Sequence, residues 1–325
     1  MLPIAHANNA VAAAINENGA LTFYSFNGLT AEKTWNATSH EAFACVPQKG
    51  CNAIAPVPVE KGRLASVAVT LGNHIYLFGG YTVAEDNAEV STPEVFKFDP
   101  KDESYKRVTD MPMPVDDMVA FTYNERYIYL VSGWHNDGNV SLVQVYDTET
   151  DQWFRATDYP GAPVFGHAGG SVDNKFLIAD GVAVVGVKDG RRQFGAVDEV
   201  WLGEIDEINP SNIKWRAIEA HPGRPLYRMA AAGHEDSGQI VFVGGGDNPY
   251  NYNGIGYDGE PSVPSTRIFG FDIETESWVD LGVRPKATMD HRGLLFVGEK
   301  MCTLGGLDAA LNVIGDLVCS QIGEE

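Results

Sequence analysis

The stretch HIYLFGGY at residues 74–81 decides the fold of this chain, because it recurs four more times. The further copies are YIYLVSGW (127–134), KFLIADGV (175–182), QIVFVGGG (239–246) and KMCTLGGL (300–307). Each copy is a short run of apolar, largely β-branched or aromatic residues that ends in small turn residues. Such a run is typical of a strand followed by a tight turn. Its recurrence predicts an array of similar structural units.

Three more strands accompany each copy. A segment upstream leads into an apolar run such as RLASVAV (63–69), and the aromatic run VFKFDPKDESY (95–105) follows the turn. In VQVYDTETDQW (143–153) the third strand likewise ends in an acid and a polar turn, and a bulky residue of the fourth strand follows. Alternating side chains with turn residues between the runs predict four antiparallel strands in each unit.

This order of a small-residue turn, a Tyr-Asp strand and a Trp strand resembles the kelch motif. The resemblance covers essentially the whole chain and implies an all-β, six-bladed kelch β-propeller with four antiparallel strands per blade. Kelch propellers include enzymes, adaptors and lectin-like binders, so the resemblance implies a fold and leaves the activity open.

The turn glycines give the number of blades. Gly80, Gly133, Gly181, Gly245 and Gly306 mark five copies, and the path from Gly306 through both termini to Gly80 has room for two repeats. We expect the sixth, degenerate copy at residues 10–35, whose end matches strands three and four of a repeat. The chain stops after a third strand, so we expect strands from both termini to share one sheet that closes the ring.

Composition and charge narrow the function classes. A net charge of −21 makes nucleic acid a poor partner, and no apolar run is long enough for membrane insertion. The sequence indicates one acidic propeller domain at residues 8–325, with no oligomeric state assigned. Residues 1–7 resemble the tail of a secretory signal, with Ala5 and Ala7 at the small-residue positions. We therefore expect a periplasmic or secreted protein.

Four cysteines also bear on the compartment in which the protein works. Cys45 and Cys51 bracket a short loop, and Cys302 and Cys319 lie on consecutive predicted strands. We expect two disulfide bonds, with four buried free thiols as the alternative, and disulfides require an oxidising compartment. Neither pair has the spacing of a zinc site.

The repeat geometry predicts where a ligand site lies. Strand one lines the central channel and strand two runs back, so the loops after the glycine turns and the loops before strand one converge on one face. We call it the glycine-turn face. The side chains that we expect to bind a ligand there are Arg63, Asp117, Trp134, His135, His167, Tyr227, Arg228, Asn248, Tyr250, Tyr252 and Arg292. For Arg63 and Arg228 the alternative is a structural role in hydrogen bonds between blades.

A long loop at residues 244–267 belongs to the same face. Its tyrosines alternate with asparagine and glycine, and loops of this length in compact domains are usually functional or disordered. We expect Tyr250 and Tyr252 to take part in recognition. The basic pair Arg191 and Arg192 is interpreted as the solvated tip of a hairpin.

Several kinds of chemistry lack their motifs. The sequence contains no GxSxG, phosphate-binding loop, HExxH or EF-hand pattern, and no Tyr-His dipeptide for a copper radical site. His135, His167 and His291 come from different blades, which places them too far apart for a metal. We expect no cofactor and no metal.

Two hypotheses follow. The first is a module that recognises a glycan or a protein through the glycine-turn face. The second is a sugar mutarotase or epimerase in which Asp290, His291 and Arg228 act on a carboxylated sugar. This chain resembles bacterial kelch propellers that interconvert the anomers of sialic acid in its size, its blade number and its expected export. This resemblance implies the second hypothesis.

Overall fold

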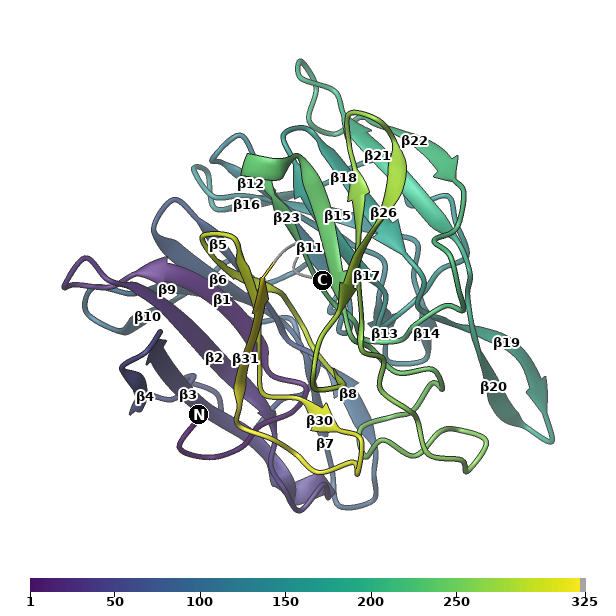
Figure 1. The fold of residues 1–325 in the computed structure, drawn as a ribbon, viewed down its shortest axis with the longest axis horizontal. Helices are drawn as coiled ribbons and strands as arrows, with labels where there is room; N and C mark the ends of the chain where they lie inside the picture. Colours follow the sequence, from purple (N-terminus) through teal and green to yellow (C-terminus); the bar gives the residue numbers. More distant parts are fainter. Residues whose placement is uncertain (322–325) are drawn as a thin grey trace.

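The structure is a computed structural model, and it describes residues 1–321. Six antiparallel sheets surround a central channel, which confirms the predicted six-bladed propeller (Figure 1). Blade one contains β1 Ala10–Ile15, β2 Leu21–Leu29, β3 Thr38–Val46 and β4 Gly50–Ile54. Blade two contains β5 Val67–Leu71, β6 His74–Phe78, β9 Val95–Asp99 and β10 Ser104–Val108. Blade three contains β11 Val119–Tyr123, β12 Tyr127–Val131, β15 Val143–Asp147 and β16 Gln152–Arg155. Blade four contains β17 Ala168–Val172, β18 Lys175–Ala179, β21 Val200–Ile205 and β22 Ile213–Ile218. Blade five contains β23 Ala230–His234, β24 Gln239–Val243, β25 Arg267–Asp272 and β26 Ser277–Val283. Blade six contains β28 Leu295–Val297, β29 Lys300–Leu304 and β31 Leu317–Gln321.

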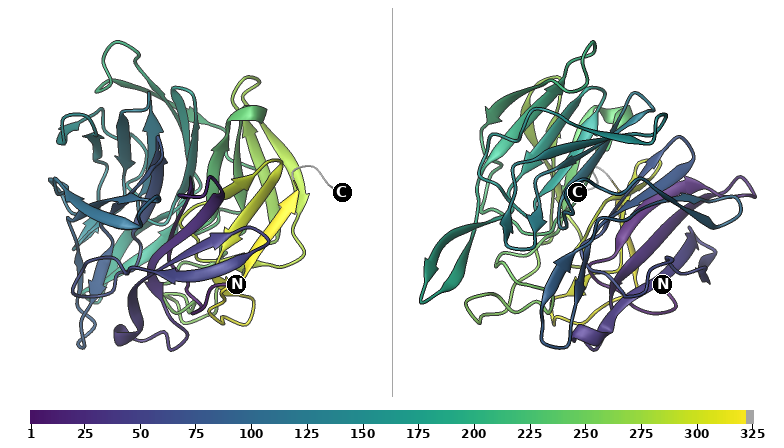
Figure 2. Two further views of the ribbon diagram at one scale, coloured as in Figure 1. Left: turned by 90° about the vertical axis from the view of Figure 1, so that its left-hand side faces the viewer. Right: turned by 180° about the vertical axis from the view of Figure 1, so that it is seen from behind.

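Short two-stranded ribbons stand outside the blades. They are β7 Tyr81–Val83 with β8 Glu89–Ser91, β13 Trp134–His135 with β14 Gly138–Asn139, β19 Val182–Lys188 with β20 Arg191–Ala196, and β27 Thr288–Met289 with β30 Leu307–Asp308. Two short 3-10 turns complete the described elements, η1 Trp35–Ala37 and η2 Glu235–Ser237. The β19–β20 ribbon projects away from the body of the propeller (Figure 1 and the right-hand view of Figure 2).

Six hydrophobic cores hold the ring together, one between each pair of neighbouring blades. Aromatic residues of the outer strands seal them: Trp153 of β16 packs against Phe78 of the preceding blade, with ring centroids 6.1 Å apart. Each sheet therefore buries both faces, which explains the nearly continuous apolar runs in the middle strands.

Two consecutive residues with positive φ end the second strand of every blade. The pairs are Asn27–Gly28, Gly79–Gly80, Ser132–Gly133, Asp180–Gly181, Gly244–Gly245 and Gly305–Gly306. The second residue, with φ between 86° and 119°, is always glycine. A Cβ atom on Gly80 would lie 2.3 Å from the Ser66 hydroxyl, so the turn packs directly under the segment that precedes strand one.

The first blade lacks a diglycine because Asn27 occupies the first position of its pair, as Ser132 and Asp180 do in blades three and four. Asparagine tolerates the left-handed conformation, so the turn keeps its geometry without the diglycine. The end of residues 10–35 was expected to match strands three and four, but β1 and β2 are strands one and two of the blade, and β3 and β4 complete it.

Ring closure also differs from the expectation. Within residues 1–321, no sheet combines strands from both ends of the chain. Backbone hydrogen bonds join the N-terminal segment to blade six instead: Leu2 N to Gly315 O at 2.7 Å and Gly306 N to His6 O at 2.9 Å. The reason is that blade one is built entirely from its own four strands, so its sheet needs no strand from the C-terminus. Leu2, His6 and Ala7 are buried within the propeller, and the assignment of residues 1–7 to a signal remnant stays a prediction.

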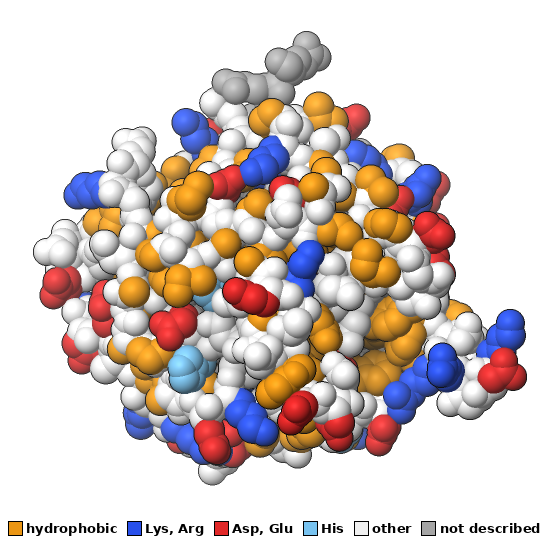
Figure 3. All heavy atoms as spheres, turned by 90° about the horizontal axis from the view of Figure 1, so that it is seen from below, with side chains coloured by type: hydrophobic (Ala, Val, Ile, Leu, Met, Phe, Trp, Pro, Cys, Tyr) orange, Lys and Arg blue, Asp and Glu red, His pale blue; other side chains and the backbone are white. Residues whose placement is uncertain are grey.

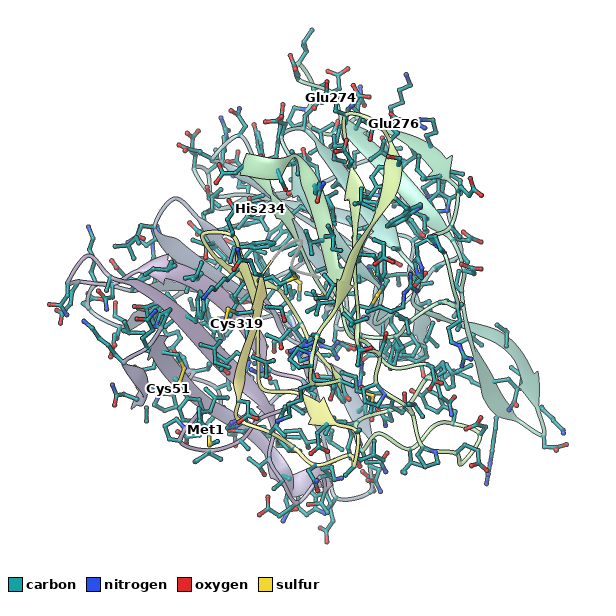
Figure 4. The ribbon with its side chains drawn as sticks, viewed as in Figure 1. Met1, Cys51, His234, Glu274, Glu276 and Cys319 are labelled. Atoms are coloured by element: carbon teal, nitrogen blue, oxygen red, sulfur yellow. A yellow bond between two sulfur atoms is a disulfide. The ribbon has the colours of Figure 1, made fainter. Side chains whose placement is uncertain are left out.

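Both predicted disulfides are present. Cys45–Cys51 links β3 to β4, and Cys302–Cys319 links β29 to β31. Cys45 and Cys302 lie in the core between blades one and six, with Cys51 packed against it (Figure 4). Both bonds therefore belong to the seam where the ring closes.

Candidate functional site

A belt of backbone hydrogen bonds surrounds the channel on the glycine-turn face. Each blade contributes one residue with positive φ two or more positions before its first strand, namely Asn8, Ala65, Asp117, Gly166, Arg228 and Asp290. Their backbone groups follow one another around the ring, as in Gly166 N to Asp117 O at 2.9 Å and Arg228 N to Gly166 O at 2.8 Å. This belt places side chains that are far apart in sequence around one opening.

Four charged side chains of this region form a buried ion cluster, defined by Asp117, Arg228, Asp290 and Arg292. Arg228 Nη2 lies 2.6 Å and Arg292 Nη1 3.0 Å from Asp117. Arg228 Nη1 lies 3.2 Å from Asp290, which also accepts a hydrogen bond from Asn8 at 3.0 Å. Two cations face two anions, so the cluster is balanced in charge.

The pKa values follow from this balance. Burial alone raises the pKa of a carboxyl group, yet the charges of Arg228 and Arg292 hold the pKa of Asp117 below its ordinary value. Burial likewise lowers the pKa of a guanidinium, but Asp117 and neighbouring groups keep the pKa of Arg228 well above its ordinary value. Arg228 is therefore a permanent cation whose charge is already neutralised by Asp117 and Asp290.

Above this ion cluster lies a pocket of about 430 Å³. The β7–β8, β13–β14 and β19–β20 ribbons and the loop at residues 244–267 form its walls. Figure 3 looks at this face, where hydrophobic side chains gather in a hollow beside the projecting ribbon. A pocket of this size suits a small ligand or an inserted side chain.

Aromatic rings make one wall and part of the floor. Phe194 stacks on Tyr257 with ring centroids 4.2 Å apart, and Trp134 packs edge-on against Phe165 at 5.4 Å. At the rim, the Arg192 guanidinium lies 5.3 Å from the centroid of Trp134 and pairs with Asp137 at 3.0 Å. The rings therefore offer flat apolar surface next to polar groups.

Two carboxyl groups face the pocket from the other side. Asp116 precedes the ion cluster in sequence and is 3% exposed, and Glu89 lies at the start of β8. Burial raises the pKa of both carboxyl groups. Asn251 of the long loop links the two sides: it donates to Glu89 at 2.7 Å and its backbone oxygen accepts from Arg228 at 2.6 Å.

The structure brings together part of the predicted set. Asp117, Trp134 and Arg228 line the pocket. Directly beneath, Tyr227 and Tyr250 flank Arg228, with centroids 4.6 and 5.2 Å from its guanidinium carbon. The two tyrosines are buried and support the floor rather than the opening.

Other predicted residues take structural positions. Arg63 pairs with Glu94 at 2.9 Å, Asn248 donates to Asp258 at 2.8 Å within its own loop, and the Tyr252 hydroxyl lies 3.4 Å from Asn87. The ring of His135 lies 2.6 Å from the Pro114 carbonyl. None of these four side chains lines the pocket.

His167, His291 and Arg292 face the central channel, a separate cavity of about 380 Å³. Burial lowers the pKa of His167 to about 4 and that of His291 to about 3, so both imidazoles are neutral at pH 7. No residue lines both cavities, and the ion cluster lies between them.

Glu89, Phe194 and Asn251 line the pocket but were not predicted from the sequence. Arg192 was interpreted as part of a solvated hairpin tip, whereas it lies at the rim of the pocket. The available signal was the long insertion between strands two and three of blades two and four, which exceeds the length that a turn needs.

Within residues 1–321, no group of three or more His, Cys, Asp or Glu side chains is arranged to hold a metal ion. None of the described helices has the length and apolar character needed to cross a membrane.

Comparisons with known proteins agree with the fold. The family described as Kelch motif matches residues 62–112, which contain blade two. Kelch-like protein 15 of Mus musculus is 29% identical over 256 residues, covering 77% of this chain and 39% of that protein. Kelch domain-containing protein 3 of Homo sapiens is 24% identical over 267 residues, covering 77% and 65%. The matched region is thus about two fifths of the length of Kelch-like protein 15.

A solved structure extends this likeness to the whole chain. The structure of YjhT matches with a TM-score of 0.76 and 17% sequence identity, over 100% of this chain and 97% of that one. Taken with the repeated turns and the six sheets, these matches show a six-bladed β-propeller that contains a kelch motif at residues 62–112 and is similar to kelch-repeat proteins.

Proposed function

We propose that this chain is a ligand-recognition module that binds a glycan or a protein segment through the pocket on its glycine-turn face. The pocket itself supports this proposal, because its aromatic wall and its hydrogen-bonding side chains converge on one space of about 430 Å³. Flat aromatic surface beside carboxyl and amide groups suits a sugar ring or an inserted side chain.

A sugar mutarotase or epimerase is the second candidate, because Asp116 and Glu89 are carboxyl groups with raised pKa beside a pocket. A carboxylated sugar such as sialic acid fits this pocket poorly. Its carboxylate would need a free cation, and the nearby Arg192 and Arg228 are both ion-paired. Binding without turnover is therefore the better-supported function.

Array binding tests the proposal. The protein is applied to an array of neutral, amino and acidic glycans and to a peptide array, and any hit is repeated with Trp134→Ala and Tyr257→Ala. We expect both variants to lose about tenfold or more in affinity, because each removes aromatic contact area from the pocket. Ile208→Ala, at a position that is 95% exposed, is the control and should bind normally. Unchanged binding by both pocket variants would place the ligand elsewhere.

Anomer exchange separates the two candidates. Freshly dissolved sialic acid and glucose are followed by NMR with and without protein. Equilibration at the rate of buffer alone is the expected result. Acceleration that is lost in Asp116→Asn would instead establish the enzyme.

We further propose that the protein works in the periplasm or outside the cell. The two disulfides at the seam support this location, since such bonds persist in oxidising compartments.

A further inference from the structure

The charges around the pocket do not cancel. Arg228 and Arg292 are matched by Asp117 and Asp290, and Arg192 is matched by Asp137 at the rim. Two carboxyl groups of the pocket, Asp116 and Glu89, have no matching cation in the described chain. Neither has an ion-pair partner among residues 1–321.

Asp116 is held in place by the protein but has no compensating charge. Its Oδ2 accepts a hydrogen bond of 2.6 Å from the Ser91 hydroxyl. That hydroxyl accepts from Asn136 N at 3.0 Å, so its single proton points at Asp116. In the described part of the chain the other carboxyl oxygen, Oδ1, has no hydrogen-bond partner, although the residue is 3% exposed and lines the pocket.

Glu89 is also held by a neutral donor, which comes from the long loop at residues 244–267. Asn251 donates to its Oε1 at 2.7 Å, and the Tyr81 hydroxyl in turn donates to Asn251 at 3.3 Å. These are neutral donors, so the charge of Glu89 also stays uncompensated. Burial of uncompensated carboxylates is costly, and it raises the pKa of both groups.

The walls indicate what kind of cation would restore the balance. A hard metal ion needs about six oxygen ligands, and the residues described here contain no cluster that supplies even three acidic, histidine or cysteine ligands. Trp134, Phe194 and Tyr257 present aromatic surface instead. Aromatic faces next to carboxylates attract organic cations through both charge and the ring quadrupole.

We propose that the pocket selects ligands that carry a protonated amine or a guanidinium group, with Asp116 and Glu89 as its counter-charges and Trp134 in its aromatic wall. This inference rests on the proposed function, because it names the chemical class that the same pocket recognises. The cation could belong to a lysine or arginine side chain of a partner or to an amino sugar. Both sources carry the protonated amine or guanidinium group that the two carboxylates would pair with.

Matched pairs of probes test the proposal. Nα-acetyl-lysine amide, Nα-acetyl-arginine amide and glucosamine are titrated at pH 7, and binding is followed by tryptophan fluorescence and NMR. Their neutral counterparts are the Nε-acetylated lysine derivative, the citrulline derivative and N-acetylglucosamine. We expect at least one charged probe to bind about tenfold or more tightly than its neutral counterpart. Which charged probe binds distinguishes the side-chain source from the amino sugar.

Variants assign the effect to the two carboxyl groups. Asp116→Asn and Glu89→Gln keep the shape of the side chains and should each weaken binding of the charged probe about tenfold, and they should weaken binding of its neutral counterpart less. Glu85→Gln, on the exposed tip of the same ribbon, is the matched control and should bind like the unmodified protein. Because both acids lose their charge on protonation, we also expect the affinity for the charged probe to fall as the pH is lowered.

Two results would overturn the inference, and they differ in what they mean for the proposed function. If neutral probes bind as well as charged ones and Trp134→Ala abolishes both, the pocket is a binding site but not a cation site. If no charged probe binds, and array ligands bind without any effect of Trp134→Ala, both proposals fail.

Discussion

Arg228 occupies the centre of the glycine-turn face and is 2% exposed. It is a buried charge that two carboxylates, a backbone oxygen and two tyrosine rings surround. Its backbone lies in the left-handed region, with φ of 55°. That conformation is unfavourable for a residue with a side chain, and here the belt of backbone hydrogen bonds compensates for it.

Removing this charge should destabilise the fold strongly. Arg228→Ala leaves Asp117 and Asp290 with one arginine between them, and breaking a buried ion pair in this way costs about 3–5 kcal/mol. The midpoint of urea unfolding, followed by circular dichroism, measures the effect. Arg107→Ala breaks an exposed pair with Asp110 and should cost less than about 1 kcal/mol. Equal effects of the two substitutions would show that the ion cluster is not a structural centre.

At the scale of elements, the ribbons between strands two and three distinguish this propeller from a bare ring. The sequence predicts the blades because each strand pair repeats its own turn chemistry. It does not predict the β7–β8 and β19–β20 ribbons as pocket walls, since their lengths differ between blades and no repeat identifies them. Glu89 and Phe194 belong to these ribbons, so they were not predicted as ligand-binding residues.

The seam between blades one and six is a second feature at this scale. No sheet of the described chain spans it, and both disulfides lie in or against its core. The two bonds close loops with separations of 6 and 17 residues. The entropy of loop closure makes the longer one worth about 3 kcal/mol and the shorter about 2 kcal/mol.

Replacing the cysteines in pairs by serine tests this role. Cys302→Ser with Cys319→Ser should lower the unfolding midpoint more than Cys45→Ser with Cys51→Ser. A reductant should lower the midpoint of the unmodified protein to that of the protein without either bond, and it should not change the latter. If the reductant leaves the unmodified protein unaffected, the bonds do not contribute to stability.

For the whole molecule, the net charge of −21 is the dominant electrostatic feature. Acidic side chains that repel one another destabilise a compact state, and salt screens that repulsion. The same net charge attracts cationic ligands to the protein as a whole.

Screening should therefore stabilise the protein. Raising sodium chloride from about 10 mM to about 150 mM shortens the Debye length from about 30 Å to about 8 Å and should raise the thermal midpoint. Tetramethylammonium chloride at equal ionic strength should act similarly, because the effect needs no specific ion. A midpoint that falls with either salt would mean that attractive pairs outweigh the net repulsion.

The sequence by itself determined the number of blades and the face on which the loops converge, and it favoured two disulfides over four free thiols. These features depend on local chemistry, because a left-handed turn needs a small residue wherever it occurs. Only the tertiary structure decided which charges are neutralised. Arg228 and Asp117 are 111 residues apart, and Asn8 and Asp290 are 282 apart, so the ring alone brings them into contact. That pairing leaves Asp116 and Glu89 as the unmatched carboxyl groups of the pocket, because Arg228 and Arg292 are already paired with Asp117 and Asp290.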